Sequence, residues 1–336
     1  MPRSNVWEAD GFSLESLTAA INRVPYRPGQ VSASGIFTED GVSTTVVSIE
    51  ERDGILSLIE PTPRGGPGET TGDDARDQLP FIVDHYQRDD FVKADEVQNI
   101  RSFGTENQLE TLQQRVESKA QRHAADLTMT LEFQRVGALK GIVTSKGGKT
   151  LHNLYTRFGI AEPGAVSLEL DVDTTKVGSL WQDVRYSIED DLDAPYDGFH
   201  VFTGRDFHKA LWTHKSVVET FLYHGGASQL RLDVPDRFEF GGATWERYRT
   251  GTKAAADLGA QYIAANEARV AVRGVPDLFI TRFAPADYEE TVNTPGLPFY
   301  AKQFPSQDGK GRNLQVQMNA ISLCTRPKVL RKLTLT

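Results

Sequence analysis

The chain has 336 residues, of which 39% are hydrophobic and 25% charged, a composition ordinary for a folded protein and unlike that of a disordered one. No window approaches about 18 uninterrupted apolar residues, and the first residues lack the basic and then apolar order of a signal peptide, so we expect a soluble protein that stays where it is made. The single cysteine, Cys324, excludes a disulfide framework or cysteine metal cluster within the chain, and a net charge of −9 disfavours a protein whose task is to neutralise phosphate.

The first 35 residues predict an extended arm. Prolines interrupt residues 1–35, and a single short amphipathic stretch, Phe12–Ile21, fits a helix of two turns. Such a segment cannot bury a core of its own.

A hairpin and a long loop are predicted next. The strand-like residues 44–49 and 55–59 flank Arg52-Asp53-Gly54, which is a good turn signal. Residues 62–78 contain no aliphatic residue larger than alanine and are dense in glycine, proline and charge. Because the strand-like residues 79–83 follow at once, we expect an exposed loop, and loops of this length are usually functional or disordered.

Residues 105–140 predict a long amphipathic helix. Thr105 and Gln108 suit a capping box at its start, and Gly141 suits its end. At about 1.5 Å per residue such a helix runs roughly 50 Å, which is typical of a spine or a coiled coil. Its apolar residues recur at spacings of three or four, or their sum: Leu109, Leu112, Val116, Ala120, Ala124, Leu127, Leu131 and Ala138. A stripe so rich in alanine favours the spine.

The rest of the chain predicts an α+β lobe. Residues 142–155 form a hairpin candidate that turns at Gly147-Gly148, and residues 313–335 alternate like a strand before an apolar finish. Between them we expect helices at 174–192 and 207–223 and short strands at 198–202, 262–264 and 268–272.

None of the candidate active or metal sites has the required spacing. Residues 145–150 suggest a phosphate-binding loop, but Val143 stands where the first glycine is required and the segment follows a helix, so we expect a hairpin turn. His200, His208 and His214 would scatter around a helix, and with His224 they predict no metal site.

The charged runs are interpreted as surface. Asp89-Asp90 and residues 189–193 are expected to be solvated faces, not general acids or calcium ligands. The basic residues 326–332 alternate with apolar ones and predict an edge strand that carries protective charge in preference to a DNA contact. Cys324 is expected to be a small buried apolar residue. We therefore expect no enzyme, no catalytic residue, no cofactor and no metal.

Motifs in the last third of the chain resemble one protein family. They are Trp245-Glu246-Arg247-Tyr248-Arg249, the segment 284–296 followed by Tyr300-Ala301-Lys302, and Met318–Pro327. They are similar to segments of the lambda-like phage major capsid protein E family, although that family often has Ser-Asn-Pro-Leu where this chain has Met318–Ile321. The resemblance is strong over residues 235–336 and rests on the order of elements before that.

The resemblance implies the Hong Kong 97-type capsid fold, an α+β fold. Its expected parts are an N-terminal arm at 1–35, an extended loop region at 36–92 with its exposed tip at 62–78, a peripheral domain at 93–165 with the spine helix 105–140, an axial domain at 166–299, and C-terminal strands at 300–336 that return to the peripheral domain.

The same resemblance implies a shell-building protein. Copies would form hexamers and pentamers and close an icosahedral phage head around double-stranded DNA, without sequence-specific binding. Portal protein and scaffolding or decoration proteins are further expected partners, a membrane is not, and assembly would take place in the host cytoplasm.

Ionic contacts between copies are expected at the loop tip. Residues 62–78, going out and back, reach about 25 Å at roughly 3.3 Å per residue and could lie across a neighbour. The candidate intersubunit contacts are Arg64, Glu69, Asp73, Asp74, Arg76 and Asp77.

Three alternatives remain open. A bacterial nanocompartment shell of the same fold would enclose a cargo enzyme in place of DNA. A hydrolase would use acidic residues with His200 or His208, and a coiled-coil scaffold would be built on residues 105–140.

Overall fold

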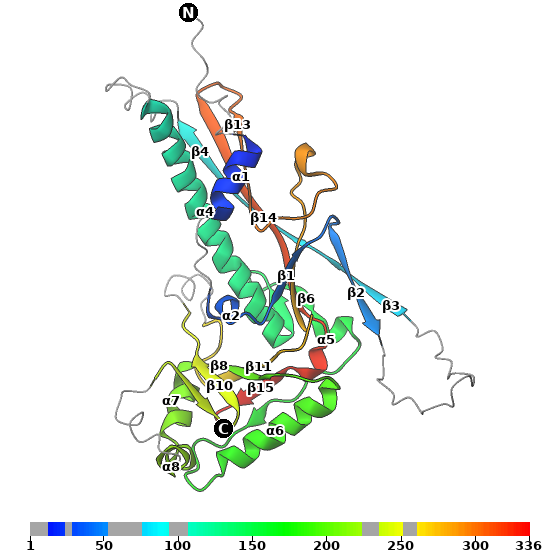
Figure 1. The fold of residues 1–336 in the computed structure, drawn as a ribbon, viewed down its shortest axis with the longest axis vertical. Coiled ribbons are helices and arrows are strands. Elements are labelled where there is room, and N and C mark those ends of the chain that lie inside the picture. Colours follow the sequence, from blue (N-terminus) through cyan, green and yellow to red (C-terminus); the bar gives the residue numbers. More distant parts are fainter. Residues whose placement is uncertain (1–12, 24–28, 53–75, 94–106, 224–234, 251–260) are drawn as a thin grey trace, which may run out of the picture.

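Helix α4 (Asn107–Lys140) is the longest element, and it confirms the predicted spine. The computed structural model describes residues 13–23, 29–52, 76–93, 107–223, 235–250 and 261–336. Figure 1 shows an elongated molecule in which α4 and long strands form the upper part, and a second sheet with helices packed around it forms the lower part. In the described chain, no helix combines the length and apolar content that crossing a membrane requires.

From Val116 onward, the apolar stripe of α4 is buried within its own chain. Val116, Ala120, Ala124 and Leu127 pack with strand residues that include Val316 and Met318. The alanines give this face a low profile, which lets a strand lie close along the helix. Because the chain itself covers the stripe, the coiled-coil interpretation loses the surface it requires.

The sheet against α4 is organised around β14 (Gly311–Cys324). Its order is β1 (Thr38–Gly41), β12 (Phe279–Phe283), β14 and β13 (Tyr300–Pro305), and β4 (Asp84–Lys93) also pairs with β14. β4 pairs antiparallel with β14 from Gly311↔Lys93 to Ala320↔Asp84. Helix α1 (Leu14–Arg23), which confirms the short amphipathic helix of the arm, packs against this part through Leu17 and Ile21.

A two-stranded ribbon projects from the same part (Figure 1). β2 (Val46–Arg52) pairs antiparallel with β3 (Arg76–Ile82), from Val46↔Ile82 to Arg52↔Arg76. The predicted turn at residues 52–54 and the strand 55–59 lie largely outside the described residues, and the partner that the structure gives to β2 is β3. The predicted loop 62–78 is also too long by three residues, because the strand begins at Arg76: ladder bonds are made by backbone groups and do not need apolar side chains.

A short hairpin follows α4. β5 (Ile142–Thr144) and β6 (Thr150–Asn153) pair around the predicted turn, and Gly148 has a φ of +78°, which glycine adopts without strain. Helix α5 (Leu154–Arg157) comes next, with Asn153 accepting a capping hydrogen bond from the Thr156 N–H. The hairpin interpretation of residues 145–150 is therefore confirmed.

The lower part is built on a six-stranded sheet. Its order is β7 (Val166–Ser167), β15 (Arg331–Thr334), β11 (Glu267–Arg273), β8 (Gly198–Thr203), β10 (Ala243–Arg247) and β9 (Arg237–Phe240). β8 and β11 confirm two predicted strands, whereas residues 262–264 form none. Gly241 and Gly242, with φ of +61° and +75°, make the tight turn between β9 and β10.

Three helices belong to this sheet, one more than the sequence predicts. α6 (Val177–Leu192) is confirmed, and its Trp181 ring lies 5.0 Å from the ring of Trp245 on β10. The predicted helix 207–223 is instead two helices, α7 (Arg205–Thr213) and α8 (Lys215–Tyr223). The break is His214, which has extended backbone angles and whose ring contacts the Val172 carbonyl at 3.1 Å.

The end of the chain divides between the two sheets. β13 and β14 lie in the sheet against α4, but β15 lies between β7 and β11 in the six-stranded sheet. The edge-strand prediction for residues 326–332 is therefore wrong, and the expected return of 300–336 to the peripheral part holds only for β13 and β14. Cys324 is buried as predicted, and burial raises the pKa of its thiol to about 12.

A buried carboxylate, Glu132 of α4, joins the two parts. It accepts hydrogen bonds from the N–H groups of Val31 (2.8 Å) and Ser32 (3.0 Å), at the start of helix α2 (Gln30–Ala33), and from the Ser32 hydroxyl (2.6 Å). The Tyr248 hydroxyl, just after β10, donates a further bond of 3.0 Å. A Cβ at Gly29 would lie 2.0 Å from the Glu132 Cδ, so only glycine fits there.

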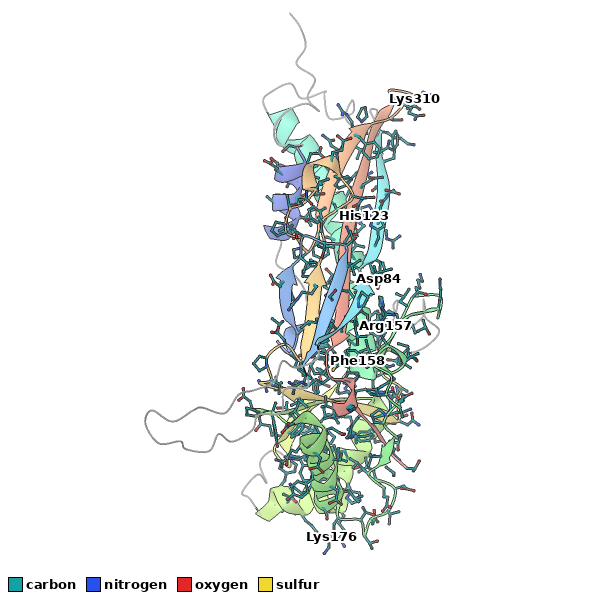
Figure 2. All side chains as sticks on the ribbon, turned by 90° about the vertical axis from the view of Figure 1, so that its right-hand side faces the viewer. Asp84, His123, Arg157, Phe158, Lys176 and Lys310 are labelled. Atoms are coloured by element: carbon teal, nitrogen blue, oxygen red, sulfur yellow. The ribbon has the colours of Figure 1, made fainter. Side chains whose placement is uncertain are left out.

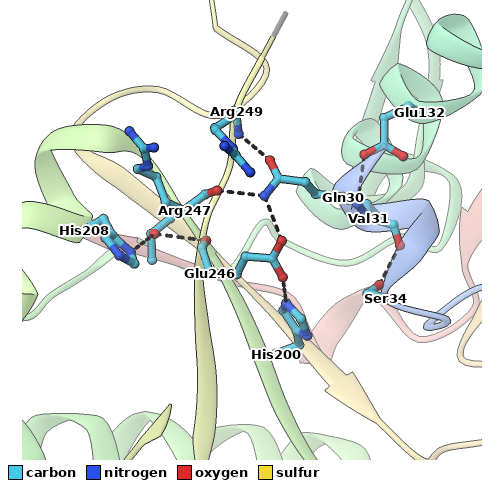
Figure 3. A network of polar contacts seen from close by, with 10 residues as sticks. Gln30, Val31, Ser34, Glu132, His200, His208, Glu246, Arg247 and Arg249 are labelled. Carbon is cyan, nitrogen blue, oxygen red and sulfur yellow. Dashed lines mark hydrogen bonds and ion pairs between the residues drawn. The ribbon is translucent and has the colours of Figure 1, made fainter. Parts of the chain in front are cut away.

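Gln30 extends this junction into the six-stranded sheet (Figure 3). Its amide N–H group donates to the Glu246 carboxylate at 2.7 Å and to the Arg247 carbonyl at 2.8 Å, and its carbonyl accepts from the Arg249 N–H. Glu246 also pairs with His200 at 3.0 Å. Burial raises the pKa of the Glu246 carboxyl, but the hydrogen bonds from His200 and Gln30 outweigh it and hold that pKa below its ordinary value.

We predict that Glu132→Gln lowers the free energy of unfolding by about 2–3 kcal/mol, because an amide offers one acceptor and turns a donor toward an N–H group. Urea denaturation of the purified protein measures the loss. Glu219→Gln on the exposed side of α8 is the matched control and should change stability by less than about 0.5 kcal/mol. Equal stability of the two variants would contradict the role given to Glu132.

Candidate functional site

The β2–β3 ribbon presents one buried and one exposed apolar face. Side chains alternate along a strand, so Val47, Ile49 and Phe81 face the core and are buried. The opposite face carries Val46 and Ile82, which pair directly across the ribbon and are 40% and 71% exposed. An exposed cross-strand apolar pair on a two-stranded ribbon is a surface that lacks its cover.

The end of the ribbon at residues 80–82, which we call its foot, is held in place by contacts with residues that follow α4. The Phe81 ring lies 6.2 Å from the ring of Phe158 and 6.1 Å from that of His152, and the Arg157 guanidinium lies over it at 5.6 Å. Arg157 also donates a hydrogen bond to the Pro80 carbonyl. Figure 2 shows Arg157 and Phe158 close together below Asp84, at the level where the two parts of the molecule meet. The foot therefore moves with the hairpin that follows α4.

Asp84 ties the start of β4 to α4 and to the hairpin. Its carboxylate accepts a hydrogen bond of 3.2 Å from Gln134 and lies 3.0 Å from the His152 Nε2. The same Gln134 nitrogen donates to the Tyr86 hydroxyl at 2.8 Å. Burial, with the charge of Asp84, raises the pKa of Tyr86 well above its ordinary value.

A buried arginine fixes β1, the strand that leads into the ribbon. The side chain of Arg135 on α4 is 1% exposed and pairs with Glu39 on β1 at 2.6 Å. Its Nε also donates to the Thr281 hydroxyl on β12 at 3.2 Å, and the guanidinium lies over the Phe37 ring. A charge this deeply buried is tolerated only because its donors have partners.

A groove of about 570 Å³ opens at the end of the ribbon, next to Thr45 and Val83. On its floor, Asn319 donates to the Pro285 carbonyl at 2.7 Å, which leaves its carbonyl to accept from the His85 Nδ1 at 2.7 Å. With the Asn319 amide in this orientation, the His85 Nδ1 is the donor of that hydrogen bond. The apolar rim includes Val292, which is 64% exposed. The groove is lined by Ser43, Thr44, Thr45, Val83, His85, Ala284, Pro285, Ala286, Asp287, Val292, Asn293 and Asn319.

Two of the six candidate contacts from the sequence, Arg76 and Asp77, lie at the far end of the ribbon. Arg64, Glu69, Asp73 and Asp74 lie outside the described residues. Arg76 and Asp77 are at the start of β3, where they pair with Arg52 and Glu51. Their part in contacts between copies stays a prediction.

The three described histidines of the lower part, His200, His208 and His214, each have a protein partner. Besides the His200–Glu246 pair, His208 contacts the Thr203 hydroxyl at 2.8 Å and the Pro235 carbonyl at 2.7 Å. Burial lowers the pKa of His208. His224 lies outside the described residues. No group of His, Cys, Asp or Glu that could hold a metal ion occurs in the ranges that the structure describes.

The sequence did not predict the exposed pair or the groove. Val46 and Val47 are identical residue types with opposite exposure, so the side chain alone does not say which one faces out. The sequence does contain one usable signal: Phe81 and Ile82 are successive apolar residues of one strand. Their side chains must point to opposite faces, so one of the two is expected to be exposed unless both faces are covered. The groove needs segments far apart in sequence, such as His85 and Asn319.

Comparisons with known proteins agree with one another. The model of the family described as phage major capsid protein E matches residues 13–335. The major capsid protein of Pseudomonas phage KPP10 is 29% identical over 347 residues, which cover 96% of this chain and 97% of that protein. The major capsid protein of Salmonella phage Felix O1 is 22% identical over 355 residues and 96% of each chain.

Solved structures resemble the fold at low sequence identity. A protein assigned as a prophage capsid protein of E. coli CFT073 has a TM-score of 0.58 and 11% identity, over 96% of this chain and 99% of that one. The capsid of Myoviridae phage XM1 has a TM-score of 0.50 and 12% identity, over 91% and 92%. At such identities the likeness establishes the fold.

We predict that Asn319→Asp lowers the free energy of unfolding by about 2–3 kcal/mol at neutral pH, because a carboxylate cannot donate to the Pro285 carbonyl. Thermal and urea unfolding measure the effect. Gln315→Glu, an equivalent change on the half-buried face of β14, is the control and should stay within about 0.5 kcal/mol of the parent protein. A similar loss in both variants would show that charge on β14, and not the lost donor, is responsible.

Proposed function

Because the chain belongs to the family of phage major capsid protein E, we propose that its copies form hexamers and pentamers and close an icosahedral head around packaged DNA. The chain has the Hong Kong 97-type capsid fold. It is a major capsid protein of a tailed bacteriophage, a component of the virion that builds a shell from copies of itself. The observation that carries the proposed assembly is the exposed Val46–Ile82 pair on an anchored ribbon.

In the proposed shell, a neighbouring copy covers this pair. Fully burying one aliphatic side chain stabilises by about 1.5–3 kcal/mol, and the contact repeats in every copy. A two-stranded ribbon has marginal stability alone, so cover by a neighbour would also order the ribbon itself. The rigid foot would transmit the position of one copy to the next.

The loop tip and the arm would add further contacts. In our proposal, residues 62–78 lie across the adjacent copy and residues 1–35 strap a neighbour. Arg64, Glu69, Asp73, Asp74, Arg76 and Asp77 would then form ion pairs between copies. Each exposed pair contributes under about 1 kcal/mol, so strength would come from many copies and from buried apolar area.

The shell would enclose the packaged DNA without binding it tightly. A net charge of −9 repels a polyanion at long range, which suits a container. Portal protein and scaffolding or decoration proteins are proposed as further partners, with assembly in the host cytoplasm. We propose that the chain has no catalytic site, in keeping with the structural role of its family.

The nanocompartment alternative makes a different prediction for the contents. Both the matched family and the curated relatives are phage proteins, and they favour a shell for DNA. Shells isolated from phage-infected cells should contain nucleic acid. A folded cargo enzyme in its place would favour the nanocompartment.

We predict that Ile82→Asp leaves the stability of the unassembled protein within about 0.5 kcal/mol of the parent, because the residue is 71% exposed. The yield of closed shells should fall at least about tenfold, since burying an unpaired carboxylate costs several kcal/mol. Electron microscopy and size-exclusion chromatography measure the yield. Ile82→Val keeps the apolar contact and should assemble normally, and normal assembly of the Asp variant would exclude a neighbour at this face.

We also predict that deleting residues 65–75 leaves a folded protein that fails to close shells. Circular dichroism tests the fold, and electron microscopy tests closure. Replacing the same residues with a Gly-Ser segment of equal length separates the effect of reach from that of the charged side chains. Normal particles from the deletion variant would refute the proposal that residues 62–78 lie across the adjacent copy.

A further inference from the structure

An uneven group of charges lies where the end of α4 meets the six-stranded sheet. The Glu267 carboxylate on β11 is 3.2 Å from the Nζ of Lys332 on β15, 3.4 Å from Arg269 and 3.8 Å from the Nζ of Lys140, the last residue of α4. Arg269 and Lys332 are directly opposite each other in the sheet. We call Lys140, Glu267, Arg269 and Lys332 the cationic cluster.

The cluster holds more donors than acceptors. Like charges directly across a sheet destabilise it, and one carboxylate cannot offset three cations. The side chain of Arg269 is nine-tenths buried, and its Nε–H has no acceptor in the described part of the chain. Burial lowers the pKa of Lys140, and Arg269 and Lys332 lower it further against the raising effect of Glu267. A further anion at this place would relieve the imbalance.

The cluster is open to a side chain from outside. The Lys140 and Lys332 side chains are 29% and 36% exposed, whereas those of Glu267 and Arg269 are nearly covered. A carboxylate on a flexible side chain can reach between the two lysines. A phosphate held in a wide duplex reaches two partly covered lysines less easily than a flexible side chain does, and the net charge of −9 also disfavours DNA here.

The chain carries exposed carboxylates on the other side of the same sheet. Asp183, Tyr186 and Asp190 lie on one face of α6, and Tyr186 is 54% exposed. Neither aspartate has a hydrogen bond or ion pair with another described residue. Tyrosine is enriched in protein interfaces, and charged groups are found mainly at the polar rim around the interface core.

The cluster and the α6 face cannot meet within one chain. α6 packs through Trp181 on the sheet face that carries Trp245 and Phe199, while Arg269 and Lys332 alternate onto the opposite face. Two complementary patches on opposite sides of one lobe meet in a head-to-tail contact, the type that closes rings.

We propose that Lys140 and Lys332 of one copy bind Asp183 or Asp190 of a second copy. This inference rests on the proposed function, because the partner is another subunit of the shell. The carboxylate completes the charge of the cluster, and Tyr186 fills the contact beside it.

Zero-length carbodiimide cross-linking of mixed shells tests the pairing. Shells are assembled from equal amounts of unlabelled and nitrogen-15-labelled protein, and linked peptides are identified by mass spectrometry. We expect mixed-isotope links from Lys140 or Lys332 to Asp183 or Asp190. Closed shells with links only inside one copy, or only to other acidic residues, overturn the pairing, while absence of any shell counts against the proposed function instead.

Charge variants give an independent measure. Lys332→Gln should raise the protein concentration needed for assembly about fivefold, as expected for one lost ion pair. Lys209→Gln on the exposed face of α7 should have no effect. The swapped variant Lys332→Asp with Asp190→Lys should recover assembly relative to Lys332→Asp alone. Failure of the swap, together with unchanged assembly of Lys332→Gln, also overturns the pairing.

Discussion

One buried carboxylate determines how the arm, the spine and the lower part of the molecule are joined. The four groups that donate to Glu132 are neutral N–H and O–H groups, so dipoles and not a cation stabilise its charge. Helix α2 has only four residues and would not persist alone. Because Glu132 bonds to Val31, Ser32 and Tyr248 together, displacing the arm or the segment after β10 would leave part of this buried carboxylate without donors.

The two faces of the six-stranded sheet differ in their balance of apolar and polar contacts. Against α6 the sheet presents large apolar rings, such as Phe199 and Trp245, and one cation, Arg331, which bonds to Ser187 and Asp191 of that helix. Toward α4 and the arm it presents Glu267, which pairs with Lys140 of α4, and Glu246, which accepts a hydrogen bond from Gln30 of the arm. An interface built from directional bonds sets the orientation of one part against the other. In a shell protein, that orientation decides the curvature that repeated copies produce.

Local patterns predicted much of the fold, and long-range pairings were missed. The stripe of α4 and the apolar runs of β8 and β11 follow their own periodicity. The partner of β2 and the insertion of β15 beside β11 depend on backbone ladders between distant segments, which side-chain patterns do not encode. The role of Glu132 could not be predicted for a related reason. Its partner Val31 lies 101 residues away, and a single glutamate beside an apolar stripe predicts a solvated side chain.

The charge of the chain explains why the assembly surfaces have their particular form. At −9, copies repel one another at long range, so association depends on contacts that act only at short range. In the proposed shell the Val46–Ile82 pair would be such a contact, because apolar burial acts only when the surfaces touch and is insensitive to charge. The cationic cluster would be another, since its surplus positive charge would attract a carboxylate that comes close to the two lysines. An acidic subunit with these two surfaces would resist non-specific association and would still bind its neighbour in one orientation.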